Sequence, residues 1–165
     1  RVPAGVAARH SELELAVRRP SAERLAWARS LPAQPQAEWP HRWSGIYARE
    51  AIELSEYPER YRVPLQVLRI GEVGIAAIPC EVFAETGLAI KRDSPLSHTF
   101  TVELANGYSG YLPTVEQHRL GGYTTWRARS SCLEEEAEPK IVAKILELLN
   151  TVADRRNDQP LVPAP

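Results

Sequence analysis

The stretch Leu65-Gln66-Val67-Leu68-Arg69-Ile70-Gly71-Glu72-Val73-Gly74-Ile75-Ala76-Ala77-Ile78 decides the fold class. Residues 65–70 alternate and are rich in branched side chains, Gly71-Glu72 is typical of a tight turn, and residues 73–78 form a nearly continuous apolar run. This pattern predicts a β-hairpin whose second strand is buried on both faces.

The residues after this hairpin predict a crossover to a further strand. Pro79 ends the apolar run, residues 81–90 predict a helix that turns Phe83, Gly87 and Ile90 toward the sheet, and residues 99–105 predict a strand. Two strands joined through a crossover helix run parallel. The sequence therefore predicts an α/β fold with a mixed sheet covered by helices.

Helices are predicted on both sides of this region. Ser21 is a suitable N-cap for a short helix that ends before Pro32, and residues 44–54 predict a second amphipathic helix. Near the C-terminus, residues 131–134 resemble a capping box and Pro139 suits the first helical position. The helix that follows has an apolar stripe made of Ile141, Ile145, Leu148, Leu149 and Val152.

Length and composition limit the organisation of the chain. At 165 residues it is long enough for one domain. We expect residues 1–20 to be an exposed lead-in and residues 154–165 to be a disordered, Pro-rich tail. Because the chain begins at Arg1 and contains no Met, we expect it to be an excised or incomplete piece of a longer protein.

Charge and hydropathy narrow the class of partner. The hydrophobic fraction of 44%, the charged fraction of 25% and the net charge of -1 are those of an ordinary globular protein. Nothing in them favours nucleic acid as a partner, and we expect no transmembrane segment because no apolar run is long enough. Cys80 and Cys132 are expected to be separate thiols.

Two segments place polar side chains just beyond apolar runs. They are Ile78-Pro79-Cys80-Glu81-Val82-Phe83 and Asn106-Gly107-Tyr108-Ser109-Gly110-Tyr111-Leu112-Pro113. Strand ends are where α/β proteins place their chemistry, so a carboxylate and a phenol delivered there can converge on one pocket. The loop of residues 106–131 is expected to be functional because it is long and rich in aromatic residues.

Simpler roles for these residues stay open. Glu81 is also a suitable residue for a helix N-terminus, and the tyrosines are also suitable loop anchors.

The histidines of the chain are His10, His41, His98 and His118. They lie in segments that we interpret as surface or turn, so we expect none of them to be a zinc ligand.

Together with Leu-Gly-Gly-Tyr-Thr-Thr-Trp at 120–126 and Arg-Ala-Arg-Ser-Ser at 127–131, these segments resemble the neutral/alkaline (non-lysosomal) ceramidase family. The resemblance is to the C-terminal part of the catalytic domain in its environmental-bacterial form, and it covers roughly residues 20–153, with 21–153 forming the domain. It implies a zinc-dependent amide hydrolase that cleaves N-acyl sphingoid bases (ceramide) to fatty acid and sphingosine. It also implies that Glu81 and Tyr111 bind the zinc and that Tyr123 lies beside the substrate amide.

The sequence departs from the family at several positions. Cys80 stands where other members have Gly, and Thr124 where Glu often follows the tyrosine. The family's zinc-binding and catalytic histidines lie upstream, and no stretch here matches their motifs. The resemblance therefore implies a partial active site, inactive alone, with a lipid substrate, a missing N-terminal half as partner, and an exported location.

Three readings of the chain remain. The chain is either part of such an enzyme or a non-catalytic fragment or pseudoenzyme that acts as a binding module, and a zinc amidase with a different acyl-amide substrate is a third reading. Histidine motifs upstream of the chain would favour the enzyme.

Overall fold

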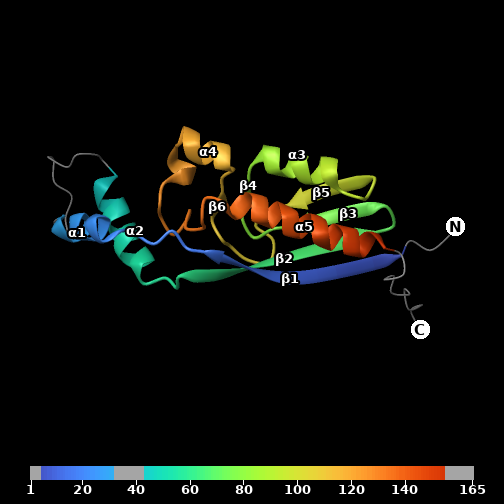
Figure 1. Ribbon diagram of the computed structural model, residues 1–165, viewed down its shortest axis with the longest axis horizontal. Helices are drawn as coiled ribbons and strands as arrows, with labels where there is room; N and C mark the ends of the chain where they lie inside the picture. The colour runs from blue at the N-terminus through green and yellow to red at the C-terminus, as the bar shows by residue number, and fades with distance from the viewer. Residues whose placement is uncertain (1–4, 32–42, 155–165) are drawn as a thin grey trace.

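The computed structural model describes residues 5–31 and 43–154. A four-stranded sheet with the strand order β1-β2-β3-β5 carries the fold (Figure 1). The strands are β1 (Val6–Ala16), β2 (Arg60–Ile70), β3 (Val73–Ala77) and β5 (His98–Val102). β1 and β3 pair antiparallel with β2, whereas β5 pairs parallel with β3. The predicted hairpin, the parallel strand and the mixed α/β sheet are all confirmed.

Two helices cover one face of this sheet. α5 (Ala137–Ala153) packs across β1 and β2, and α3 (Ala84–Asp93) lies over β5 (Figure 1). Burying each large aliphatic side chain of such a core contributes about 1.5–3 kcal/mol. Gly74 allows close packing on two sides, because an added Cβ would lie 2.8 Å from Thr99 Oγ1 of the neighbouring strand β5 and 3.3 Å from Leu149 Cδ2 of α5. The predicted stripe on α5 is confirmed, since all of its members are buried in the core with Val63, Leu65, Val67 and Ile90.

The expectation that residues 1–20 form an exposed lead-in is wrong for residues 6–16. These residues form the edge strand β1, which is paired with β2 along its whole length, and Leu15 is fully buried. The charged side chains of Glu12 and Glu14 alternate with the buried ones and lie 3.5–3.8 Å from Arg62 and Arg60. This alternation has the period of a half-buried strand, but the run is short and stands among small and charged residues, so its signal is weak.

The opposite face of the sheet is largely uncovered in the described part of the chain. Val73 and Ile75 of β3 are half-buried, so the prediction that this strand is buried on both faces is wrong. Beside them Ile70, Phe100 and Val102 are 40–50% exposed. An apolar sheet face with no second layer over it is unusual for a parallel pair of strands.

Two predicted helix starts are also wrong. α3 begins at Ala84 rather than at Glu81, because residues 81–82 form the short strand β4 (Glu81–Val82). α5 begins at Ala137, and Pro139 is its third residue. Glu134 does not close a capping box, since its Oε1 accepts a hydrogen bond of 2.8 Å from the backbone N–H of Ala16 at the end of β1.

The helices predicted near residues 21–31 and 44–54 are confirmed. α1 (Ala22–Ser30) starts at Ser21, whose hydroxyl accepts a hydrogen bond from the N–H of Arg24, and α2 (Ser44–Ser55) follows. The two helices pack on each other through Ala28, Ala48 and Ala51 and extend beyond one end of the sheet (Figure 1).

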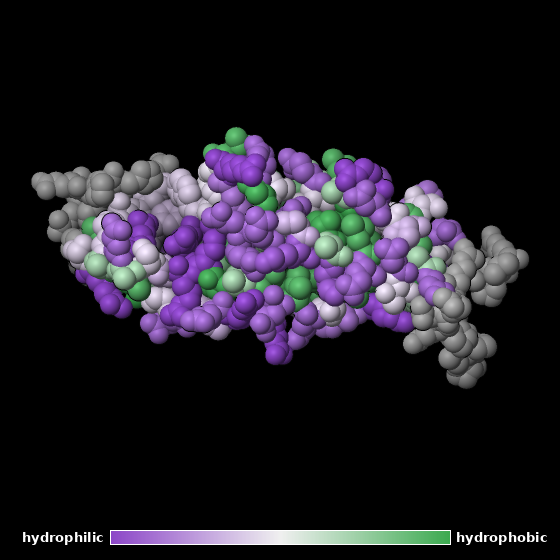
Figure 2. All heavy atoms as spheres, viewed as in Figure 1, coloured by the Kyte–Doolittle hydropathy of each residue, from purple (hydrophilic) through white to green (hydrophobic). Residues whose placement is uncertain are grey.

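Hydrophilic side chains cover most of the molecular face that Figure 2 shows. No helix in the described ranges is long and apolar enough to cross a membrane. The predicted tail at 155–165 lies outside the described residues.

Candidate functional site

Glu81 and Tyr111 are paired directly in a second, two-stranded sheet. β4 (Glu81–Val82) and β6 (Tyr111–Leu112) run parallel, with Glu81 opposite Tyr111 and Val82 opposite Leu112. Residues opposite each other in register project to the same face of a sheet. The structure therefore brings together the carboxylate and the phenol that the sequence predicted from two separate strand ends.

Backbone hydrogen bonds join the two segments. The N–H of Glu81 donates to the carbonyl of Gly110 at 2.9 Å, and the N–H of Ser109 donates to the carbonyl of Pro79 at 2.6 Å. On the other side, Tyr111 N–H donates to the Ser130 carbonyl at 2.8 Å. The backbone around the pair is thus fixed by three segments at once, as a site for ligand binding requires.

Gly110 is required by this arrangement. Its φ is +78°, a region in which residues with a Cβ are strained, and a Cβ added there would lie 2.5 Å from the Ser130 carbonyl oxygen. The close approach of the 127–131 segment depends on the missing side chain. Gly110 therefore positions Tyr111, the next residue along the chain.

Tyr123 lies against Tyr111. It begins the short 3-10 helix η1 (Tyr123–Thr125), and its ring meets that of Tyr111 edge to face, with centroids 5.6 Å apart and planes at 88°. Burial, a hydrogen bond with Tyr123 and the negative charge of Glu81 raise the pKa of Tyr111 to about 12. Tyr123 itself is 63% exposed, so its hydroxyl is accessible to a ligand from solvent.

Tyr108 lies near Glu81 as well, and with Tyr111 and Tyr123 it forms what we call the tyrosine cluster. The sequence did not single out Tyr108 as a site residue. Burial and the negative charge of Glu81 raise the pKa of Tyr108, and a side-chain hydrogen bond with Glu81 contributes. The phenol is thereby kept protonated beside the carboxylate. The spacing Tyr-x-x-Tyr of Tyr108 and Tyr111 is the sequence signal that could have predicted a place for Tyr108 in this cluster.

The loop that carries these tyrosines contains more regular secondary structure than its sequence indicates. Residues 106–131 have no clean periodicity in sequence, yet they contain β6, the helix α4 (Val115–Leu120) and η1. Each element is only a few residues long, too short to produce a period. The prediction of a long irregular loop is thus wrong in detail.

As a metal centre, the cluster supplies part of a ligand set. A carboxylate and a phenol are both oxygen donors, and a phenolate at Tyr111 needs a neighbouring cation to offset its raised pKa. No group of three or more His, Cys, Asp or Glu side chains suited to a metal occurs within residues 5–31 and 43–154. Glu81 and Tyr111 therefore supply two ligands of a zinc site, which needs at least three protein ligands.

The histidines are spread over the surface of the fold. His10 is on β1, His98 on β5 and His118 on α4, whereas His41 lies outside the described residues. Burial and the positive charge of Arg18 lower the pKa of His118. None of the three described histidines belongs to a metal-binding cluster.

Cys80 and Cys132 are buried free thiols, as predicted. Burial, followed by the charge of Cys132, raises the pKa of Cys80 to about 12, so the thiol is protonated and packs as a small apolar side chain. Cys80 belongs to the hydrophobic core.

Comparison with solved structures finds ceramidases. Neutral ceramidase from Pseudomonas aeruginosa matches with a TM-score of 0.57 and 16% identity, over 97% of this chain and 30% of that one. A ceramidase complexed with C2 matches with a TM-score of 0.49 and 20% identity, over 66% of this chain and 17% of that one. No protein-family model and no curated protein matches the chain.

These matches concern the fold. The chain has the fold of a part of the Pseudomonas enzyme and spans 30% of its length. The resemblance to ceramidases, first seen in short sequence segments, is confirmed at this level.

Proposed function

We propose that the chain is part of a zinc-dependent amide hydrolase of the ceramidase type, acting on N-acyl sphingoid bases. One observation carries the proposal: Glu81 and Tyr111 are opposite each other in register, with Tyr123 packed on Tyr111, within a fold similar to part of a neutral ceramidase. These three polar side chains come from distant parts of the sequence, and packing of the fold does not require them to lie together. Their proximity therefore supports a functional site.

In this proposal each residue has its own role. The carboxylate of Glu81 and the phenol oxygen of Tyr111 hold the metal, and the hydroxyl of Tyr108 orients the carboxylate by donating to it. Zinc, when bound, supplies Lewis-acid activation of water and of the amide carbonyl. Tyr123 donates a hydrogen bond to the amide oxygen as negative charge develops there.

The rest of the site is proposed to come from a further part of the protein. Two oxygen donors leave the ligand set incomplete, and the proposed reaction needs a general acid and base, which we expect to be a histidine outside this chain. The exposed apolar face around Ile70, Phe100 and Val102 supports the presence of another layer there. We propose that the missing N-terminal half of the catalytic domain covers this face.

The incomplete ligand set also favours a second candidate, a non-catalytic binding module. The two candidates differ in what happens when the longer protein is tested. We expect the longer protein to bind zinc and to hydrolyse a fluorogenic short-chain ceramide, whereas the 165-residue chain alone binds zinc weakly and is inactive. A longer protein without zinc or turnover would support the binding module instead.

The acyl-amide specificity is tested with the same preparation. Turnover of a short-chain ceramide is compared with turnover of N-acyl amino acids of equal chain length. We expect ceramide to be preferred. A preference for the amino acid derivative would keep the zinc amidase and replace its substrate.

A further inference from the structure

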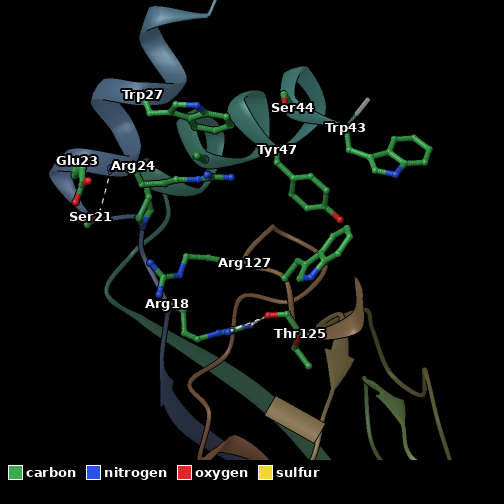
Figure 3. A pocket seen from close by; sticks show the side chains of 13 residues that line it. Arg18, Ser21, Glu23, Arg24, Trp27, Trp43, Ser44, Tyr47, Thr125 and Arg127 are labelled. Atoms are coloured by element: carbon green, nitrogen blue, oxygen red, sulfur yellow. Dashed lines mark hydrogen bonds between the residues drawn. The ribbon is translucent and has the colours of Figure 1, made fainter. Parts of the chain in front are cut away.

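A pocket of about 890 Å³ lies apart from the tyrosine cluster, between α1, α2 and the residues that follow Tyr123 (Figure 3). This volume is in the range of pockets that bind small organic molecules. Neither Glu81 nor any tyrosine of the cluster lines it. The pocket and the proposed zinc site therefore have separate linings.

Three guanidinium groups give the pocket a positive charge. They belong to Arg18, Arg24 and Arg127, while the lining includes one carboxylate, that of Glu23. Within the described ranges no carboxylate forms an ion pair with any of the three arginines. Glu23 lines the pocket, and the charge of Glu135 acts on Arg18, but the three guanidinium groups leave the lining with an excess of positive charge. Such an excess favours the binding of an anion there.

Arg18 is held in place by the protein itself. Its guanidinium donates to the Thr125 carbonyl at 3.2 Å and to the Ser131 carbonyl at 2.7 Å, and its buried Nε has no partner in the described structure. Burial, and then the charge of Arg127, lower the pKa of Arg18, and the same two causes lower that of Arg24. The charge of Arg127 thus acts against the charged forms of both Arg18 and Arg24.

Aromatic rings form the remaining walls. Three of the four tryptophans in the chain line the pocket: Trp27, Trp43 and Trp126. Arg24 lies with its Cζ 3.8 Å from the ring centroid of Trp27 and extends along it toward Tyr47 (Figure 3). This stacking orients the guanidinium and leaves its N–H groups for a ligand.

We propose that this pocket binds an amphiphilic organic anion, with a carboxylate or phosphate held by the guanidinium groups and an apolar body against the indole rings. Arginine binds both oxyanions through paired hydrogen bonds, and indole rings are large apolar surfaces. A ligand with only the anionic group or only the apolar body makes half of these contacts, so we expect it to bind more weakly. This proposal does not depend on the proposed amidase function and is tested without turnover.

The first test is a titration of the 165-residue chain followed by tryptophan fluorescence. The ligands are dodecanoate and dodecyl phosphate, and the controls are dodecanol, which lacks the charge, and inorganic phosphate, which lacks the apolar body. We expect at least one of the two amphiphilic anions to bind ten or more times more tightly than either control, and their order identifies the preferred head group. Equal binding of dodecanol or of inorganic phosphate would overturn the proposal.

The second test uses variants of the exposed arginines, because Arg18 has a structural role. We expect Arg24→Gln and Arg127→Gln each to weaken binding of the preferred anion about tenfold or more, the usual cost of one charge-assisted contact. The matched control is Arg119→Gln on α4, where the arginine pairs with Glu116 at 3.5 Å outside the pocket. Unchanged affinity in both pocket variants, with native circular dichroism, contradicts the assignment.

Discussion

Glu81 and Tyr111 are thirty residues apart in sequence and stand opposite each other in a parallel two-stranded sheet. The Glu81 N–H donates to the Gly110 carbonyl, so the carboxylate and the phenol are fixed relative to each other by the backbone. Because the geometry is set before any ligand binds, the energetic cost of assembling these two donors is already met by folding.

The first prediction concerns Glu81 in the longer protein that we propose. Glu81→Gln should lose zinc and activity together, because a neutral amide is a poorer ligand for a cation than a carboxylate. We expect affinity for zinc to fall by more than about 10²-fold. Elemental analysis of the purified variant, beside turnover of a short-chain ceramide, measures both. Glu85→Gln, an exposed residue in the first turn of α3, is the matched control.

Tyr123→Phe separates catalysis from metal binding. The phenyl ring keeps the edge-to-face contact with Tyr111, while the hydroxyl that we propose as a donor to the amide oxygen is lost. We expect a full zinc content and a rate lower by about 10²-fold or more, as for other deleted oxyanion donors. A near-normal rate would show that Tyr123 is only a packing residue.

Tyr108 is expected to act through Glu81. Tyr108→Phe removes the hydroxyl that we propose as a donor to the carboxylate, and loss of such an outer partner costs about 10–100-fold in metal affinity. Excess zinc should restore the rate of this variant, whereas it should not restore that of Tyr123→Phe. A zinc titration of activity distinguishes the two.

The strands of the core were predictable because their pattern matched their burial. Residues 65–78 alternate or run apolar, and both strands lie against α5. β1 was missed although Glu12 and Glu14 alternate with Leu13 and Leu15, because this short run stands among small and charged residues and is a weak strand signal. Its pairing with β2 depends on contacts distant in sequence, which no local window contains.

Convergence of Glu81 and Tyr111 was predictable as a possibility, since both follow apolar runs. Their exact opposition was not, because two-residue strands have no period and their register depends on Gly110 and the Ser130 carbonyl. The roles of Glu81 and Tyr111 as zinc ligands stay predictions. The pocket between α1 and α2 was not foreseen at all, because its arginines and tryptophans come from three separate segments.

A further prediction concerns pH and the attachment of α2. Arg129 donates to Glu50 Oε1 at 2.8 Å and to Oε2 at 3.0 Å, and this hydrogen bonding lowers the pKa of the largely buried Glu50 carboxyl. A lowered folded pKa means that the pair stabilises the fold above the unfolded pKa, near 4.5, and that this contribution is lost as the pH falls through the folded pKa.

We therefore expect Glu50→Gln to reduce the free energy of unfolding at pH 7 by about 1–2 kcal/mol. The difference between the variant and the wild type should shrink toward acidic pH. Urea unfolding at pH 7 and at an acidic pH measures both, with Glu116→Gln on α4 as an exposed control. A difference that stays constant with pH would mean that charge at Glu50 contributes nothing.

Tyr111→Phe is the variant that decides between the two readings of this residue. The ring remains available to pack against Tyr123 and Leu112 stays buried beside it, so a loop anchor should tolerate the loss of a half-buried hydroxyl with little change in stability. A zinc ligand should not, because the phenol oxygen is the donor itself, and zinc content should then fall while the melting temperature of the metal-free protein is kept. The measurement is zinc content and metal-free melting temperature in the same preparation. Full zinc occupancy in Tyr111→Phe would show that Tyr111 is not a ligand. Of the two zinc ligands that we propose in this chain, only Glu81 would then remain.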